Sequence, residues 1–200
     1  MSRLLRATES VTVDFFARPA QELAPDLLGC VLIHGETAGM LVETEAYLGM
    51  EDLAAHGSKG LTPRTRVIFG PPGRAYVYFI YGMHECFNVV ADRDGTPGCV
   101  LVRALEPLCG LEQMYARRKW KGPAIGLANG PGKLTQALAI TREHYGARLD
   151  RGELTIRRWR ERPQFEIEVT PRIGISHCRD WPLRFAWAHH PCVSRGLRRS

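Results

Sequence analysis

Hydrophobic and polar residues alternate along much of the first half of the chain, which is the pattern of half-buried β-strands. Residues 30–33 and 40–47 form two such runs around a turn at residues 35–39, so they predict a β-hairpin. Gly82 and the turn sequence DGTPG separate the next runs. These further strand-like runs cover residues 75–81, 85–91 and 99–105 and, in short pieces, 154–187. We therefore expect strands to dominate the first half.

Helical patterns are fewer and do not alternate with the strands. Residues 20–28 predict a short helix that is entered through Pro19 and interrupted at Pro25. Two more helices are predicted at residues 108–118 and 131–140, the second with proline at its first position. Because strands and helices show no βαβ rhythm, the chain is predicted to have an α+β fold.

The composition is that of one folded domain, with 200 residues, 44% of them hydrophobic and 24% charged. The longest apolar run is far shorter than the roughly 20 residues of a membrane helix, and no signal-peptide core is found in the first twenty residues. We expect a glycine- and proline-punctuated domain over residues 13–190, a flexible N-terminus at 1–12 and a basic tail at 191–200. The protein is expected in the cytoplasm, with its six cysteines reduced and mostly buried.

Charge is distributed unevenly along the chain, although the net charge is only +6. Residues 1–110 contain 9 Lys and Arg against 13 Asp and Glu, whereas residues 111–200 contain 18 against 8. Solubility alone could account for a positive net charge. A basic excess in one half of a compact domain can also neutralise phosphates, so the second half is the better candidate for contact with a nucleic acid.

Two glutamates on one predicted strand are the first candidates for chemistry. Since alternate side chains of a strand share a face, residues 41–47 are predicted to bring together Leu41, Glu43, Glu45 and Tyr47. A solvent-facing polar strand is the common reason for such a carboxylate pair. The aromatic ring beside the carboxylates favours a binding site instead.

The segment after this strand, residues 49–74, is polar, rich in Gly and Pro, and predicted to be a long loop that carries function. It contains His56 between small residues, which allow a ligand to approach the backbone closely. A lone histidine in a loop is more often a surface residue than a catalyst. His56 is therefore a candidate only because of the glutamates and the tyrosine nearby.

One arginine interrupts the apolar run at residues 99–105. Arg103 is predicted to share a face with Leu101 and Leu105, and a buried guanidinium requires a carboxylate partner. The two glutamates are the nearest candidates by type, and a carboxylate beside an arginine stays ionised, as a general base must. The alternative is an edge position with Arg103 in solvent.

Aromatic side chains crowd the strand-like run at residues 75–81. Tyr76 and Tyr78 are predicted to share a face, and Tyr81 to stand at the strand end, where Gly82 lets the chain turn. Aromatic residues in strands more often belong to a core than to a binding surface. Together with a basic second half, they could also stack on nucleobases.

Four long segments carry a pattern that covers most of the chain. They read VETEAYLGMEDLAAH at residues 42–56, TPRTRVIFGPPGRAYVYFIYGMHECFNV at 62–89, CVLVRALEPL at 99–108 and GPGKLTQALAI at 130–140. Together they closely resemble the alkyladenine, or 3-methyladenine, DNA glycosylase family. The resemblance implies a single α+β domain with a curved mixed or antiparallel sheet, an open barrel-like roll with peripheral helices.

The resemblance also implies a function, that of a monofunctional enzyme of base-excision repair. Such an enzyme flips a damaged purine out of duplex DNA and hydrolyses its N-glycosidic bond with water. No cofactor and no metal are implied. The protein is expected to act as a monomer on double-stranded DNA, away from membranes and associated with the nucleoid if the source is a bacterium.

Catalytic and base-binding roles follow from the same resemblance. It implies that Glu45 is the general base, that Arg103 helps to hold the attacking water and that the backbone carbonyl of Ile175 is the third contact of that water. The flipped base is expected to stack between Tyr47, His56 and Tyr78, with the His56 amide as a donor to the base edge.

The resemblance further implies contacts with DNA outside the base slot. Asn88 is expected to exclude an ordinary guanine through its exocyclic amine, and Tyr81 to fill the gap left in the duplex. Met83, His84 and Lys133 are expected to contact DNA. His84 departs from the family pattern, which generally has tyrosine there, so contacts with the flanking DNA are expected to differ.

Two other functions stay open from the residues alone. The sequence NGPGK at 129–133 could begin a helix-hairpin-helix with Lys133 as a Schiff-base nucleophile and Asp150 downstream, although that class of lyase is helical throughout. A non-catalytic nucleic-acid-binding module could use the basic half and the tyrosines without any chemistry. The sequence does not rank 3-methyladenine, 7-methylguanine, hypoxanthine or ethenoadenine as substrates.

Overall fold

The computed structural model describes residues 1–80 and 82–194. Tyr81, predicted to fill the gap in the duplex, and residues 195–200 of the predicted basic tail lie outside the described residues. Residues 1–12, predicted to be flexible, contain the helix α1 (Ser2–Ala7) and the strand β1 (Thr8–Ser10). Their flexibility stays a prediction.

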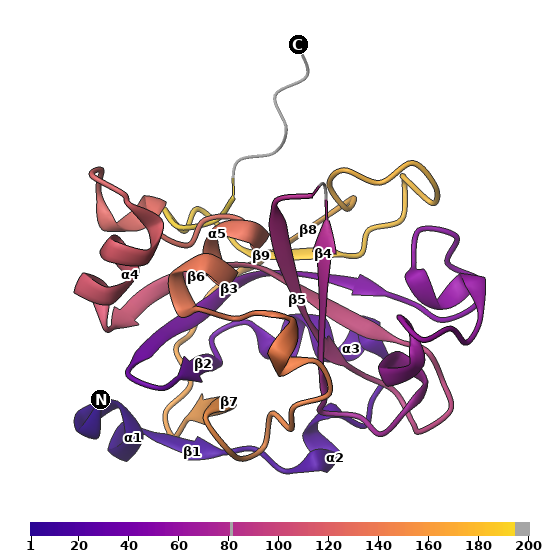
Figure 1. The fold of residues 1–200 in the computed structure, drawn as a ribbon, viewed down its shortest axis with the longest axis horizontal. Coiled ribbons are helices and arrows are strands. Elements are labelled where there is room, and N and C mark those ends of the chain that lie inside the picture. Colours follow the sequence, from indigo (N-terminus) through magenta and orange to yellow (C-terminus); the bar gives the residue numbers. More distant parts are fainter. Residues whose placement is uncertain (81, 195–200) are drawn as a thin grey trace.

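The chain forms one α+β domain around a single antiparallel sheet (Figure 1). The remaining strands are β2 (Val31–His34), β3 (Thr37–Tyr47), β4 (Ala75–Ile80), β5 (His84–Val90), β6 (Cys99–Cys109), β7 (Leu154–Trp159), β8 (Ile167–Thr170) and β9 (Arg184–Trp187). Their order is β1-β7-β2-β3-β6-β5-β4, and β9, which pairs with β8, joins the sheet beside β3. All strand pairs among the described residues are antiparallel, and the sheet does not close into a barrel.

The helices lie at the periphery of this sheet. They are α2 (Val13–Phe16), α3 (Ala20–Leu27), α4 (Leu111–Arg118) and α5 (Pro131–Leu138), with short 3-10 helices η1 (His56–Lys59), η2 (Arg66–Phe69), η3 (Ala124–Gly126) and η4 (Arg142–His144). α3 packs against β3, and α5 against β5 and β6. Fully buried side chains such as Phe16, Leu27, Phe87 and Met114 fill the main core. None of the described helices has the length and apolar character that crossing a membrane requires.

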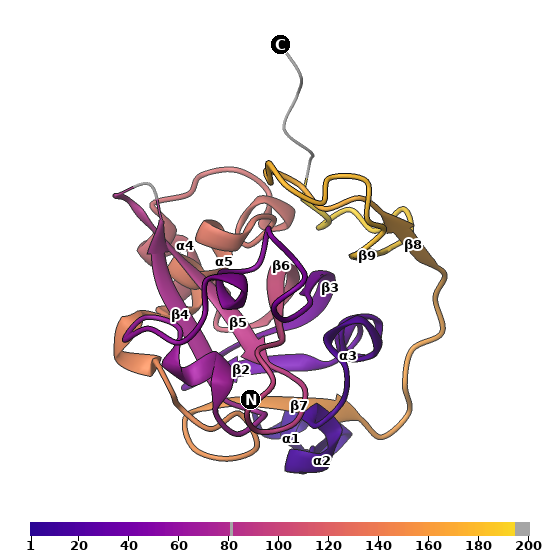
Figure 2. The same ribbon diagram turned by 90° about the vertical axis from the view of Figure 1, so that its right-hand side faces the viewer.

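Figure 2 shows how the two longest strands lie at the centre of the molecule. β3 and β6 run between the β4–β5 hairpin on one side and the β8–β9 pair on the other. β3 pairs with β2 over its first residues and with β9 at residues 43–45, so its middle is covered by strands on both edges. A side chain on that stretch is therefore held by the sheet on both sides.

The predicted elements are largely confirmed, with a few differences. The helix α3 continues through Pro25 to Leu27 instead of being interrupted there. The helix predicted at 108–118 begins only at Leu111, because β6 extends to Cys109 and Gly110 turns the chain with a positive φ of 71°. The loop at 49–74 is confirmed, with η1 and η2 as its only helical turns among the described residues.

Two β-bulges correct the predicted faces of β3 and β6. Between the pairs Leu41–Leu105 and Thr44–Val102 the register shifts twice, first by an extra residue on β3, Val42, and then by an extra residue on β6, Arg103. The shifts compensate each other, so the regular pairing resumes. As a result Leu41 and Leu105 lie in the main core, and the prediction that they share a face with the charged residues is wrong.

Candidate active site

Glu43 is the centre of a buried ionic network. Its Oε1 accepts hydrogen bonds from Nε of Arg103 at 2.9 Å, from Nε of Arg184 at 2.7 Å and from the hydroxyl of Ser194 at 2.9 Å. Its Oε2 accepts the backbone amide of Ser194 at 2.6 Å. Glu43 is fully buried and its carboxylate accepts four hydrogen bonds from the protein, two of them from guanidiniums, so its place in the network is to hold Arg103.

Glu45 lies two residues further along the same face and has different partners. Its Oε1 is 3.2 Å from Nη1 of Arg103 and accepts the backbone amide of Ile173 at 2.8 Å, while the hydroxyl of Tyr47 donates to its Oε2 at 3.0 Å. Burial raises the pKa of the Glu45 carboxyl, against the opposing effects of Arg103 and of the two hydrogen bonds. A carboxylate with a raised pKa is a stronger base than an ordinary one.

The predicted meeting of Arg103 with the two glutamates is confirmed, and the alternative of a solvated edge position is wrong. The guanidinium contacts both carboxylates, and only 7% of the residue is exposed. The bulge at Arg103 turns its side chain to the carboxylate face. Bulges are over-represented next to active sites because they re-aim a side chain in this way.

A second buried ion pair, which the sequence analysis missed, lies behind Tyr47. Arg172 binds Asp52 through two hydrogen bonds, one of 2.9 Å, and donates to the carbonyl of Ala46. Its guanidinium carbon is 4.6 Å from the centroid of the Tyr47 ring. Asp52 in turn accepts the amides of residues 48 and 54, so the pair fixes the start of the long loop behind the aromatic ring.

Three aromatic residues on the other side of the site form a wall. Nδ1 of His56 is 2.8 Å from the hydroxyl of Tyr76, and the centroids of the His56 and Tyr78 rings are 4.6 Å apart. The predicted common face of Tyr76 and Tyr78 is confirmed, with ring centroids 5.2 Å apart. Burial, together with the nearby charges of Arg64 and Lys59, lowers the pKa of His56 to about 4, so its ring is neutral at physiological pH.

The pairing of strands joins the wall to the carboxylates. Glu45 on β3 is opposite Leu101 on β6, which is opposite Asn88 on β5, which is opposite Tyr76 on β4. Directly opposite residues of antiparallel strands point to the same face. Glu45, Asn88 and Tyr76 therefore line one face of the curved sheet, and Nδ2 of the buried Asn88 donates to the carbonyl of Tyr76 at 3.0 Å.

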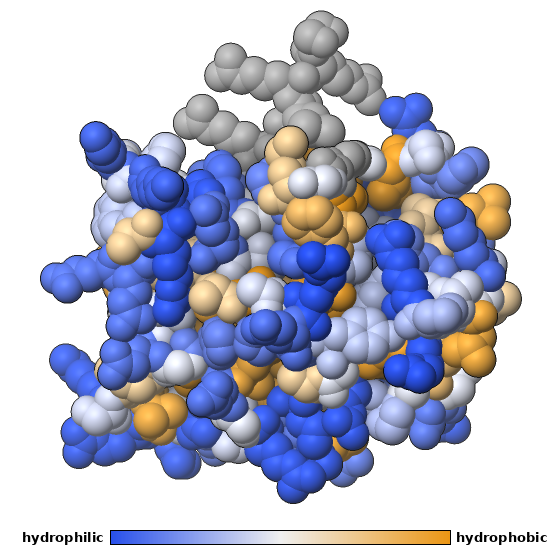
Figure 3. Space-filling view, viewed as in Figure 1, coloured by the Kyte–Doolittle hydropathy of each residue, from blue (hydrophilic) through white to orange (hydrophobic). Residues whose placement is uncertain are grey.

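The end of the β4–β5 hairpin carries an exposed apolar surface (Figure 3). There the exposed fractions of Phe79 and Met83 are 40% and 67%. His84 packs so closely on Gly132, at the start of α5, that a Cβ at Gly132 would come within 2.9 Å of its ring. Lys133, on the exposed side of α5, contacts Asn129 at 2.8 Å. The structure thus brings together Met83, His84 and Lys133, three of the predicted DNA contacts.

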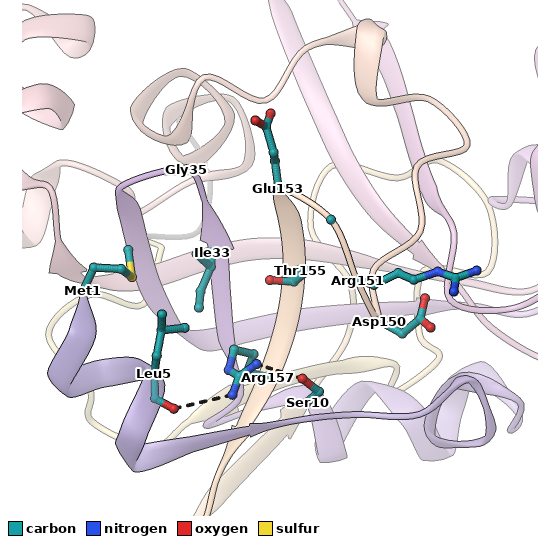
Figure 4. A pocket seen from close by; sticks show the side chains of 11 residues that line it. Met1, Leu5, Ser10, Ile33, Gly35, Asp150, Arg151, Glu153, Thr155 and Arg157 are labelled. Carbon is teal, nitrogen blue, oxygen red and sulfur yellow. Dashed lines mark hydrogen bonds between the residues drawn. The ribbon is translucent and has the colours of Figure 1, made fainter.

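Ile175 and Asp150 are the predicted residues that the structure does not connect with this site. The segment of Ile175 reaches Glu45 through the amide of Ile173, two residues earlier. Asp150 binds Arg148 with two hydrogen bonds of 2.9 and 2.6 Å. It lines a hollow of about 360 Å³ between α1, β2 and β7 (Figure 4), at the opposite end of the molecule from the β4–β5 hairpin tip.

Metal ligands are not clustered in the described part of the chain: no group of three or more His, Cys, Asp or Glu residues there could hold an ion. The six cysteines are free thiols, four of them buried. The segment before α5 is the 3-10 helix η3 rather than a full helix, so the helix-hairpin-helix alternative lacks its first helix.

Comparison with known proteins gives a consistent result. Residues 14–191 match the family model described as methylpurine-DNA glycosylase. A protein of Methanoculleus marisnigri named "Putative 3-methyladenine DNA glycosylase" is 50% identical over 187 residues, which cover 90% of this chain and 96% of the relative. Proteins with the same name from Rhodopseudomonas palustris and Myxococcus xanthus are 49% and 44% identical, covering 86% and 91% of this chain and 81% and 92% of theirs.

Proposed function

Because the chain belongs to the methylpurine-DNA glycosylase family, we propose that it excises damaged purines from duplex DNA by hydrolysis, with Glu45 as the general base. It is a DNA repair enzyme that cleaves N-glycosyl bonds. The observation that carries the assignment to Glu45 is its position: a fully buried carboxylate held by Arg103, Tyr47 and Ile173 beside a group of aromatic rings.

The proposed reaction uses water as the nucleophile. As the bond between C1′ of the sugar and the purine nitrogen breaks, the electron pair leaves with the base and the sugar acquires oxocarbenium character. The Glu45 carboxylate stabilises this positive charge and takes a proton from the water that attacks C1′. The products are the free base and an abasic site. Arg103, whose guanidinium contacts Glu45, and the Ile175 carbonyl are proposed to hold this water.

The flipped base is proposed to stack between Tyr47, His56 and Tyr78. The fixed position of Tyr47, with Arg172 behind it and its hydroxyl on Glu45, supports this assignment because a rigid ring loses little entropy on binding. The His56 amide is the proposed donor to the base edge. Asn88 is proposed to reject guanine, and its hydrogen bond to β4 supports a fixed orientation of its amide.

The hairpin end and the start of α5 are proposed to contact the duplex. Met83, His84 and Lys133 are exposed on neighbouring elements there, and Tyr81 is proposed to enter the gap left by the base. The protein is proposed to act as a monomer, in the cytoplasm and on the nucleoid in a bacterium. The contacts of Ser194 with Glu43 support a working domain that extends slightly beyond the predicted 13–190.

The variant Glu45→Gln tests the proposed base, because it keeps the shape of the side chain and removes the charge. We expect release of hypoxanthine or alkylpurine from duplex DNA to fall at least about a hundredfold, while affinity for the lesion duplex is kept. Glu106→Gln, the same change at a partly exposed position of β6, is the matched control and should stay active. A wild-type protein that binds lesion DNA but releases no base would support the non-catalytic module instead.

A further inference from the structure

Arg64 lies against the aromatic wall of the site, and its guanidinium has no carboxylate partner among the described residues. The guanidinium carbon of Arg64 is 5.0 Å from the centroid of the Tyr78 ring, within the range of a cation–π contact. Arg64 is exposed, and it lies in the long loop that also carries His56. No sequence pattern around Arg64 indicates a function for it.

The backbone of Arg64 is held firmly in this place. The side chains and amides of Thr62 and Thr65 bind each other reciprocally across it, and the Thr65 hydroxyl also donates to the carbonyl of Gly60 at 2.9 Å. The hydroxyl of Tyr145 donates to the carbonyl of Arg64 at 3.2 Å. Because its backbone is fixed, the charge of Arg64 stays at the rim of the wall.

The other charges around the site are balanced. Three buried guanidiniums, of Arg103, Arg172 and Arg184, face three carboxylates, of Glu43, Glu45 and Asp52. Arg64 and Lys59 are the cations left beside His56, and both disfavour a proton on its ring. A positively charged base stacked next to the His56 ring would be repelled by the same two cations, Arg64 and Lys59.

We propose that Arg64 biases the base slot against cationic lesions, such as N7-alkylated guanine, and toward neutral damaged purines such as hypoxanthine. This inference rests on the proposed function of the slot. An aromatic wall normally attracts a cationic base more than a neutral one. In this protein the guanidinium of Arg64 already makes the cation–π contact with Tyr78.

The bias follows whichever way Arg64 responds to the incoming base. If the guanidinium stays on Tyr78, a cationic base stacked on the wall faces a like charge across one ring. If the base displaces it, the fixed backbone keeps the charge at the rim, where repulsion persists. A neutral purine meets no such repulsion and stacks on Tyr47 and Tyr78 equally well in both cases.

The test compares Arg64→Gln with the wild-type protein on two duplexes of the same sequence, one with a single 7-methylguanine and one with a single hypoxanthine. Single-turnover excision at subsaturating protein gives a rate for each lesion. We expect Arg64→Gln to raise the ratio of the 7-methylguanine rate to the hypoxanthine rate by about three- to tenfold. Taking the ratio removes the different intrinsic reactivities of the two bases.

Two further variants separate the charge at the wall from other effects. Arg64→Lys keeps a charge and should retain the wild-type ratio, and Arg66→Gln removes an exposed charge two residues away and should leave the ratio unchanged. An unchanged ratio in Arg64→Gln, or an equal rise in Arg66→Gln or Arg64→Lys, would overturn the inference. If the wild-type protein excises neither lesion, the proposed function itself fails, which is a distinguishable outcome.

Discussion

Replacing Glu43 by glutamine should destabilise the fold strongly, although Glu43 lies on the same strand and face as the proposed base. The carboxylate accepts two guanidiniums, a hydroxyl and a backbone amide, whereas a glutamine side chain has a single acceptor oxygen. In Glu43→Gln the new NH₂ group faces donors, and two buried arginines lose a counter-charge. Breaking a buried ion pair from one side typically costs about 3–5 kcal/mol.

The size of this loss makes it easy to measure. For a chain of 200 residues, with an unfolding entropy of about 2.1 cal/mol/K per residue, such a loss lowers Tm by roughly 7–12 °C. Urea unfolding followed by circular dichroism would give the free energy directly, and an unchanged m value would show that the same surface is still buried.

Glu45→Gln is the matched comparison because Glu45 is as deeply buried on the same strand. Burial raises the pKa of Glu45, so the folded state holds its proton more tightly than the unfolded state does. Its charge therefore costs stability as the pH rises from 4.5 through the raised pKa, and glutamine should leave the free energy of unfolding unchanged or increase it. Equal destabilisation of the two variants, or a loss below about 1 kcal/mol in Glu43→Gln, would refute the division into a structural and a catalytic glutamate.

Two more predictions concern titration at the site. Excision should be lost as the pH falls through the raised pKa of Glu45. The acid limb of the pH profile of kcat/KM should therefore have its midpoint above pH 4.5. A midpoint below that value would contradict Glu45 as the base. Tyr47→Phe removes the hydroxyl that donates to Glu45 but keeps the ring, so the acid limb of kcat/KM should move to higher pH. The Kd for lesion DNA, measured by fluorescence anisotropy, should change less than about twofold. Tyr47→Ala, which also removes the ring, is the contrasting variant.

Local patterns were enough to predict most strands and the core of the site. Period-two alternation put Glu43, Glu45 and Tyr47 on one face, and the cost of burying a guanidinium required a partner for Arg103; both expectations are confirmed. The face of Leu41 was wrong because a bulge adds a residue that alternation cannot register. No motif within the strand marks such an insertion.

Long-range partners were beyond the reach of the sequence. Arg172 binds Asp52, which is 120 residues away in the sequence, and Ser194 binds Glu43, which is 151 residues away. No local sequence pattern indicates either pair. Arg172 could have been singled out in the sequence, because it lies three residues before Ile175, whose carbonyl was expected to contact the attacking water. An arginine at that point, like Arg103, requires a carboxylate when buried.

The extra residue on each strand determines where a change of strand length can be absorbed. A deletion of Val42 would remove the bulge on β3 and leave the later residues, Glu45 among them, opposite the same partners on β6. A deletion of Thr44, in the regular part of the strand, would instead turn Glu45 to the core face and bring Ala46 to the carboxylate face. Single-residue deletions in β3 are therefore compatible with the proposed chemistry at the bulge and incompatible with it one or two residues further along the chain.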